Sequence, residues 1–357
     1  MLAQHFDVDF LFFSDGSEKW IEKKNTLQFG KYNGYYVRGV RLSSRIRINT
    51  ELVHKMIGNN YDIIIQAIGG RFELLASFIL SKILRKKFIL WTNLWAHPQT
   101  LFHRLSFPVV QYIYRNADAI VAYGYHVRDY LVPLGVDERK IFYSWNVADN
   151  SLFNTVVPEE TKQNLRNNYA LNGKKVLLFV GRLVEEKGLQ YLLPAIKNLP
   201  DTLQVKLLIV GRGEKKESLL EYVQQNKMEN VQFIDYVPNE ELIQYYAVAD
   251  CLVLPSITTS TFKEPWGIVI NEAMNQGCPV IATNAVGAAM GGLVQQGKNG
   301  IIVPERNAEA LRNAIVNLFS DERKLAAMKE FTRQEISSWD EKKSVQGFSE
   351  ALRYVSK

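Results

Sequence analysis

The chain has 357 residues, of which 47% are apolar and 22% are charged, and its net charge at pH 7 is +6. This length and composition predict a soluble globular protein of about two domains, and no apolar run approaches the ~18 residues that a membrane span requires. The positive excess lies in the first half, because residues 1–150 contain 19 Lys and Arg residues against 13 Asp and Glu residues, whereas the rest has 24 of each.

The basic residues of the first half gather in two clusters, Arg38, Arg41, Arg45 and Arg47, and then Lys82, Arg85, Lys86 and Lys87. Such a surface suits an anionic membrane or a phosphorylated acceptor. Nucleic acid is not an expected partner, because no recognised binding motif accompanies the charge. The second cluster also has a simpler explanation, since cations at the end of a helix complement its dipole.

The N-terminus and the cysteines indicate a cytoplasmic protein. Residues 1–6 lack the basic start and the apolar core of a secretory signal. Cys251 and Cys278 belong to apolar, strand-like segments and form no Cys-x-x-Cys pair. We therefore expect two buried, reduced thiols.

Strands and helices alternate along the first 150 residues. One candidate strand is Tyr35–Val40, and Asn49 is a candidate cap for a helix that runs to Met56. The other expected strands are Phe6–Phe13, Tyr61–Gln66, Phe88–Thr92, Asp118–Ala122 and Lys140–Tyr143, and the helices between them include Phe72–Ile83, Thr100–Asn116 and Val127–Leu134. This alternation predicts a parallel sheet that helices cover on both faces.

A polar connector of residues 149–172 separates this unit from a second alternating series. The expected strands there are Lys175–Val180, Val205–Val210, Val231–Ile234, Asp250–Leu254, Pro279–Ala282 and Ile301–Val303, followed by helices Asn307–Phe319, Glu322–Ile336 and Trp339–Val355. The fold class is therefore α/β, with two doubly wound Rossmann-like domains, residues 1–150 and 151–336, and a terminal helix in residues 337–357. Such domains place a ligand in the cleft between them, at the carboxyl ends of the strands.

The segment Glu264-Pro-Trp-Gly-Ile-Val-Ile-Asn-Glu272 carries the strongest functional pattern. A turn at Pro265 and Gly267 leads into a helical pattern that runs from Gly267 to Gln276, so the amides near Gly267 and Ile268 are expected at a helix start, where they favour an anion such as a phosphate. Two acids that bracket such a helix start suit a ligand with a diphosphate between two polyhydroxylated groups. Taken singly, either glutamate is equally well explained as a solvated loop or helix residue.

This segment resembles the Glu-x7-Glu signature of the retaining glycosyltransferase family 4. The resemblance implies that Glu264 contacts the donor sugar and that Glu272 contacts the ribose of the nucleotide. It also implies the GT-B fold, in which the last helix, here within residues 337–357, packs back on the first domain. The first domain would then be the acceptor side and the second would bind the nucleotide sugar.

Residues 180–188, Val-Gly-Arg-Leu-Val-Glu-Glu-Lys-Gly, resemble the Gly-Arg-Leu…Lys-Gly element of the same family. The resemblance implies that Arg182 and Lys187 neutralise the donor diphosphate, whose charge grows as the glycosidic bond breaks. Taken singly, Arg182 and Lys187 are more simply explained as solvated residues. The glycine turns at Gly181 and Gly211 are expected beside the nucleotide, although the second turn is common in α/β proteins.

Three features depart from the family pattern. The opening strand and glycine loop of the first domain have no counterpart, so a truncated or misassigned start is one expectation. The histidine that family members often carry after the strand equivalent to Phe88–Thr92 has its nearest candidate in His97, which is equally well explained as a loop residue. The Val-Gly-Gly-x-x-Glu loop appears as residues 286–292 without its Glu.

The resemblance thus implies a retaining glycosyltransferase of polysaccharide or glycoconjugate synthesis, with a glycan or lipid-linked acceptor. The uneven charge adds the expectation that the basic first half docks on the inner face of a membrane. No cofactor is expected beyond the nucleotide-diphosphate sugar, and no metal, because Arg182 and Lys187 can replace a divalent cation. Two alternatives stay open: a catalytically impaired donor-binding protein, which the short start favours, and another GT-B enzyme such as a nucleotide-sugar epimerase.

Overall fold

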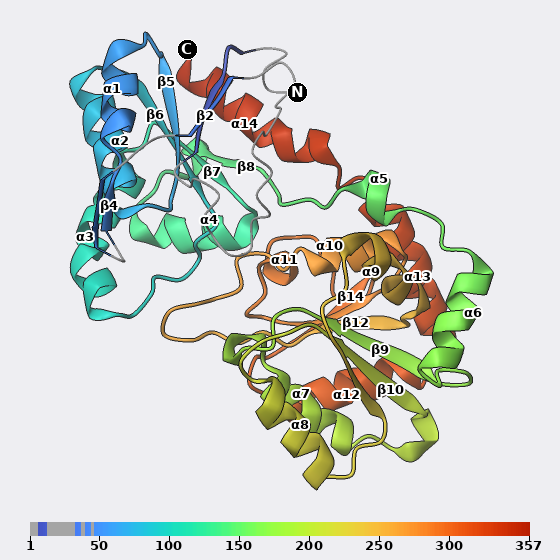
Figure 1. The fold of residues 1–357 in the computed structure, drawn as a ribbon. Coiled ribbons are helices and arrows are strands. Elements are labelled where there is room, and N and C mark those ends of the chain that lie inside the picture. The colour runs from blue at the N-terminus through green and yellow to red at the C-terminus, as the bar shows by residue number, and fades with distance from the viewer. Residues whose placement is uncertain (1–5, 13–32, 37–39, 44–45) are drawn as a thin grey trace.

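The computed structural model describes residues 6–12, 33–36, 40–43 and 46–357 (Figure 1). Two α/β units, each built on a parallel sheet, account for most of the described chain. Part of the predicted strand Tyr35–Val40, together with Arg38 and Arg45, lies outside the described residues.

The first unit contains a four-stranded parallel sheet in the order β5-β6-β7-β8. These strands span Ile63–Ala67, Lys87–Thr92, Ala119–Ala122 and Ile141–Tyr143, and the helices are α1 Thr50–Gly58, α2 Arg71–Ile83, α3 Leu101–Asn116 and α4 Tyr125–Leu131. A parallel pair, β1 Asp9–Phe12 with β2 Asn33–Tyr36, and an antiparallel pair, β3 Val40–Ser43 with β4 Ile46–Ile48, accompany the sheet. The strands from β5 onward lie where the apolar runs of the sequence predict them.

The second unit is a six-stranded parallel sheet in the order β11-β10-β9-β12-β13-β14. Its strands are β9 Lys175–Val180, β10 Val205–Val210, β11 Val231–Ile234, β12 Cys251–Leu254, β13 Val280–Thr283 and β14 Gly300–Val303. Its helices are α6 Glu159–Asn168, α7 Leu189–Lys197, α8 Lys216–Gln225, α9 Asn239–Val248, α10 Val269–Asn275, α11 Gly287–Met290, α12 Ala308–Phe319 and α13 Glu322–Ile336. Strands β10 and β12, which flank β9 on either side, are buried along their whole length, as parallel strands covered on both faces must be.

The chain passes between the two units twice. It leaves the first through the short helix α5 Asn150–Phe153 and returns with α14 Glu341–Val355, which lies beside the strands of the first unit (Figure 1). Ala351, Leu352 and Val355 of α14 form one buried cluster with residues of β6 and β7. The predicted return of the last helix to the first domain is therefore confirmed.

The side chain of Asn150 forms hydrogen bonds that connect the two segments of chain that cross between the units. This side chain donates to the carbonyl of Trp339 at 3.1 Å and accepts a hydrogen bond from Asn275 of α10 at 2.9 Å. Both crossings are thus fixed to the second unit through one amide.

Half of the second basic cluster is neutralised within the fold. Lys82 and Lys87 lie 2.9 and 3.8 Å from the carboxylate of Asp118. Burial raises the pKa of Asp118, but a backbone hydrogen bond from Phe88 and the two lysines outweigh this and lower it. Lys82 also lies in the last turn of α2, where a cation complements the helix dipole.

Cys251 and Cys278 are buried and free, as the sequence predicts. Among the helices of the described residues, none combines the length and the apolar character that crossing a bilayer requires.

Candidate active site

The segment of residues 264–266 lies between the two units and is held by both. The carbonyl oxygen of Glu264 accepts hydrogen bonds from the amide of Gly287 and from Trp95 Nε1, each at 3.0 Å. The carbonyl oxygen of Pro265 is 3.0 Å from His126 Nε2. Because Trp95 and His126 belong to the first unit, the backbone of this segment is part of the contact between the units.

The carboxylate of Glu264 is buried and forms an ion pair with Lys187. Only 13% of the Lys187 side chain and 9% of the Glu264 side chain are exposed. Ser256 Oγ donates a further hydrogen bond to the same carboxylate oxygen at 3.2 Å. A buried pair of this kind is stable only with such extra hydrogen bonds, because both charges have left water.

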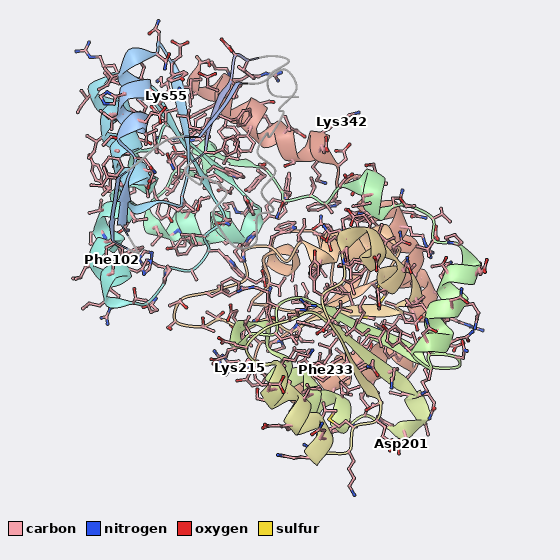
Figure 2. The ribbon with its side chains drawn as sticks, in the orientation of Figure 1. Lys55, Phe102, Asp201, Lys215, Phe233 and Lys342 are labelled. Carbon is pink, nitrogen blue, oxygen red and sulfur yellow. The ribbon has the colours of Figure 1, made fainter. Side chains whose placement is uncertain are left out.

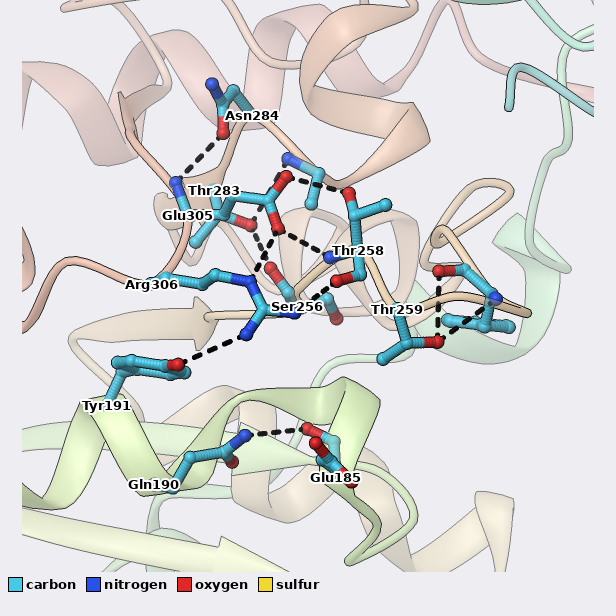
Figure 3. Close-up of polar contacts among 12 residues, drawn as sticks. Glu185, Gln190, Tyr191, Ser256, Thr258, Thr259, Thr283, Asn284, Glu305 and Arg306 are labelled. Atoms are coloured by element: carbon cyan, nitrogen blue, oxygen red, sulfur yellow. Dashed lines mark hydrogen bonds and ion pairs between the residues drawn. The ribbon is translucent and has the colours of Figure 1, made fainter. Parts of the chain in front are cut away.

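The loop that carries Ser256 is fixed by a polar network (Figure 3). Thr283 Oγ1 donates to the carbonyl of Ser256 at 2.5 Å. The carboxylate of Glu305 accepts from the amide and the hydroxyl of Thr258 at 2.5 and 2.7 Å. Asn284 in turn accepts from the amide of Glu305 at 2.9 Å. The position of the Glu264 carboxylate therefore depends on residues at or just after the carboxyl ends of β13 and β14.

Glu272 occupies a second buried carboxylate position, on α10. Tyr246 donates its hydroxyl to Glu272 Oε2 at 2.6 Å. Burial raises the pKa of Glu272 and the hydrogen bond from Tyr246 only partly offsets it. The site thus contains two buried carboxylates. Lys187 neutralises that of Glu264, whereas the only partner of the Glu272 carboxylate among the described residues is the hydroxyl of Tyr246.

Helix α10 begins at Val269, two residues later than the sequence pattern predicts. The reason is Gly267, whose φ of +88° places it outside helical geometry. Ile268 is the N-cap residue, and the amide of Ile270 is bonded to the carbonyl of Gly267 at 3.0 Å. Gly267 and Ile268 therefore form the turn into the helix.

The two predicted cations lie on the same loop after β9 but in different surroundings. Lys187 points into the buried pair, whereas 65% of the Arg182 side chain is exposed and its guanidinium lies 3.2 Å from the carboxylate of Glu186. The predicted glycine turns at Gly181 and Gly211 pack directly against each other. A Cβ on Gly211 would lie 1.9 Å from the carbonyl oxygen of Gly181. Close packing of the two strand ends accounts for glycine at position 211.

His97 is not brought to the Lys187–Glu264 pair by any contact among the described residues. Its Nε2 is 2.7 Å from the carbonyl oxygen of His103, and its ring packs against Phe107 with 4.5 Å between centroids. The histidine that contacts residues 264–266 is His126. The centroid of its ring lies 5.0 Å from the ring centroid of Trp95 and 5.9 Å from that of Trp266. Burial lowers the pKa of His126 to about 4.

His126 was not predicted as a site residue, because its sequence surroundings indicate only a position on a helix face. Ser256, Tyr246 and Glu305 were not predicted either. None of these residues belongs to a motif that the sequence shows: Ser256 lies eight positions from its partner Glu264, and the partners of Tyr246, Glu305 and His126 lie 26, 47 and 139 positions away. The one available signal was the position of His126, two residues after a glycine at the end of a predicted strand.

Residues 161–335, just under half of the chain, match the family of glycosyl transferases group 1. This segment is a group 1 glycosyltransferase domain. Lys187, Glu264 and Glu272 lie within it, whereas His97 and His126 belong to the other unit.

Two similar proteins each match about half of this chain. An uncharacterized glycosyltransferase of Methanocaldococcus jannaschii is 31% identical over 186 residues, which are 52% of this chain and 46% of the relative. The GDP-mannose-dependent alpha-(1-6)-phosphatidylinositol monomannoside mannosyltransferase of Mycolicibacterium smegmatis is 34% identical over 176 residues, 47% and 45% of the two chains. The chain thus spans about half the length of the curated relatives that it matches.

The fold extends beyond the group 1 domain to both units. The crystal structure of Anabaena HepE in complex with UDP and glucose matches with a TM-score of 0.70 and 22% sequence identity, over 90% of this chain and 86% of that one. The GT-B architecture predicted from the sequence, with two Rossmann-like units, is confirmed.

Proposed function

We propose that the protein is a retaining glycosyltransferase that moves a sugar from a nucleoside-diphosphate donor to a glycan or lipid-linked acceptor, in polysaccharide or glycoconjugate synthesis. The observation that carries the proposal is the buried Lys187–Glu264 pair, on a segment that both units hold. The names of the relatives support the donor class, since one is GDP-mannose-dependent and HepE was crystallised with UDP and glucose.

Lys187 has the position and the charge to stabilise the leaving group. As the bond from the sugar to the diphosphate breaks, negative charge grows on the diphosphate, and a fixed buried cation stabilises it without reorganising. Arg182 is on the same loop, and its exposed guanidinium can leave Glu186 for a phosphate at little cost, because exposed ion pairs contribute only about 0–1 kcal/mol.

The two glutamates then take different parts of the donor. Glu264 lies beside Lys187 and is assigned to the sugar, whose hydroxyls it would orient. Glu272, on α10, is assigned to the ribose hydroxyls of the nucleotide. Ionised carboxylates form the stronger class of hydrogen bond, which suits them to hold hydroxyl donors.

Replacing Lys187 by Ala tests the proposal. We expect the change to lower turnover of the nucleotide sugar much more than Arg212→Ala does, since Arg212 is exposed and only loosely paired with Asp235, at 3.8 Å. A screen for hydrolysis of several nucleotide sugars would first identify the donor. Equal losses in the two variants would contradict the diphosphate role of Lys187.

Metal independence is part of the same proposal. If Arg182 and Lys187 supply the positive charge, a chelator such as EDTA should leave transfer unchanged. Activity that is lost in EDTA and restored by Mg²⁺ or Mn²⁺ would reject this element of the mechanism while leaving the donor class intact.

We also propose that the basic first unit docks on an anionic membrane surface on the cytoplasmic side. Lys82 and Lys87 are partly neutralised by Asp118, so Arg85 and Lys86 are the residues of their cluster most available for lipid headgroups. Sedimentation with vesicles should require anionic lipid and should weaken with salt. Binding that depends neither on anionic lipid nor on salt would reject docking.

A further inference from the structure

The first unit contains a cavity that none of the donor-site residues lines. It has a volume of about 670 Å³ and lies at the carboxyl ends of β5 and β6, between the start of α2 and one face of α3. Its wall is mainly apolar and includes Leu74, Trp91, Val110 and Ile113. The volume is in the range of small-molecule sites, ~300–1,000 Å³.

The apolar wall continues outward to the surface of α2 and α3. Leu75, Phe102 and Val109 line the cavity and are 40%, 47% and 46% exposed. Phe102 lies on α3 at the surface of the first unit (Figure 2). Exposed apolar side chains that continue into an apolar cavity are a common mark of a site for an apolar ligand.

At its other end the cavity approaches the candidate active site. Leu94, His97 and Pro98 line it, and the same three residues line a smaller cavity of about 80 Å³ together with Phe262, Lys263 and Pro265 of the second unit.

The loop of these shared residues also contains Trp95, which donates to the carbonyl of Glu264 at 3.0 Å. A ligand that fills the large cavity can therefore extend to the segment that carries Glu264.

Two polar groups at this junction lack ordinary partners. The ammonium of Lys263 lies 3.7 Å from the centroid of the Trp95 ring, and among the described residues no carboxylate forms an ion pair with it. His97 Nδ1 is buried and has no hydrogen-bond partner in the part of the chain that the structure describes. The junction thus offers a positive charge and a free imidazole nitrogen where the apolar wall ends.

We propose that the cavity holds the hydrocarbon chain of an acceptor whose phosphate headgroup lies at Lys263. This inference rests on the proposed transferase function and specifies its acceptor as an alkyl- or isoprenyl-linked phosphate. The cavity suits the chain, and the cation at the junction suits the anionic head. The arrangement places the head next to Glu264 and the chain away from the donor side.

Binding of alkyl phosphates with 8, 12 and 16 carbons, at concentrations below their aggregation point, tests the proposal by calorimetry. Affinity should rise by about fourfold for each added methylene until the cavity is full, because each buried methylene contributes a near-constant transfer free energy. Dodecanol should bind at least fivefold more weakly than dodecyl phosphate, and Lys263→Gln should abolish this difference. Affinity that does not change with chain length would overturn the proposal.

Ser106 lines the cavity on α3, so Ser106→Phe should fill it and reduce dodecyl phosphate affinity at least tenfold. The matched control is Leu105→Phe on the same helix, where the side chain is 73% exposed and outside the cavity wall, and it should stay within twofold of the wild type. Equal affinities in the two variants would overturn the assignment. If thermal unfolding shows that Ser106→Phe does not fold, Val110→Trp occludes the same wall.

Calorimetry with UDP and GDP separates this inference from the proposed function. Both phenylalanine variants should bind the nucleotide as the wild type does. A wild type that binds nucleotide but no alkyl phosphate rejects the acceptor class alone. A wild type that binds alkyl phosphate but neither nucleotide rejects the donor proposal and leaves the apolar site standing.

Discussion

Glu272 is the residue at which stability and the proposed function oppose each other most directly. Its carboxyl group is buried and its pKa is raised by that burial, while Tyr246 supplies one hydrogen bond at 2.6 Å. The folded state therefore holds a proton more tightly than the unfolded state does. The contribution of this group to stability is fully present below the unfolded pKa of about 4.5 and is lost as the pH rises through the folded pKa.

Glu272→Gln should accordingly have two opposite effects. At pH 7 the ligand-free variant should unfold at a higher temperature than the wild type, because the amide keeps an acceptor for Tyr246 without a buried charge. Its affinity for the nucleoside diphosphate should fall about tenfold or more, since a hydrogen bond to a charged group contributes ~1.5–3 kcal/mol. Calorimetry and thermal unfolding measure the two effects.

The control for this experiment is Glu241→Gln, at an exposed position on α9. It should change neither the unfolding temperature nor the nucleotide affinity. A Glu272→Gln variant that is less stable than the wild type and binds nucleotide equally well would contradict both the desolvation argument and the ribose assignment.

At this scale, the sequence names candidate site residues only where a motif contains them. Lys187, Glu264 and Glu272 follow from local strings, but the ion pair joins residues 77 positions apart and could not be read from either string. Ser256 and Tyr246 hold the two carboxylates without belonging to any pattern. Such contacts depend on how the loops and helices pack, which local sequence does not encode.

At the scale of elements, the sequence was most informative where strands are buried on both faces. Strands such as β9 and β10 are apolar except for one lysine each, so their positions were predicted to the residue. The start of α10 was predicted less well, because one glycine conformation decides it. In the connection from β9 to α7, the conformation of a single glycine, Gly188, likewise decides where the helix begins.

Gly188 has a φ of +75°, and a Cβ there would lie 1.9 Å from the carbonyl oxygen of Pro255. Gly188→Ala should therefore lower stability by more than the ~1–3 kcal/mol that a strained backbone alone costs. It should also weaken nucleotide binding, because Gly188 directly follows Lys187, which is assigned to the diphosphate. Urea unfolding and calorimetry measure these losses.

Gly173→Ala is the matched control, since Gly173 has a similar φ of +72° and a Cβ there would meet no described atom within 4 Å. This variant should show only the backbone cost and normal nucleotide affinity. Equal destabilisation in the two variants would mean that the backbone around Pro255 adjusts freely to the added methyl group.

At the scale of the whole molecule, the two units and the return of the last helix could be predicted, but the contact between the units could not. That contact combines backbone carbonyls of residues 264 and 265 with Trp95 and His126, which are 139 to 169 positions away. Indole and imidazole donors to a carbonyl leave no periodic signal in a sequence. The consequence is that one buried histidine links the stability of the interface to pH.

Burial is the main cause that lowers the pKa of His126 from 6.5 to about 4; the hydrogen bond to Pro265 and the charge of Asp129 act in the opposite direction, and the positive charge of Lys263 makes the smallest, lowering contribution. The folded state thus keeps the ring neutral while an unfolded chain protonates it. Stability from this group is fully present above pH 6.5 and is lost as the pH falls towards 4, by about 3 kcal/mol in total at ~1.4 kcal/mol per unit.

Unfolding measured between pH 4.5 and 7.5 should therefore show a loss of stability on acidification that His126→Phe reduces, because phenylalanine does not titrate. His54→Phe, at an exposed position on α1, should keep the acid sensitivity of the wild type. Carboxylates contribute their own pH dependence of stability at lower pH, so the test is the difference between the two variants above pH 5. If His126→Phe lost stability on acidification as steeply as His54→Phe, protonation at the contact between the units would not be the cause.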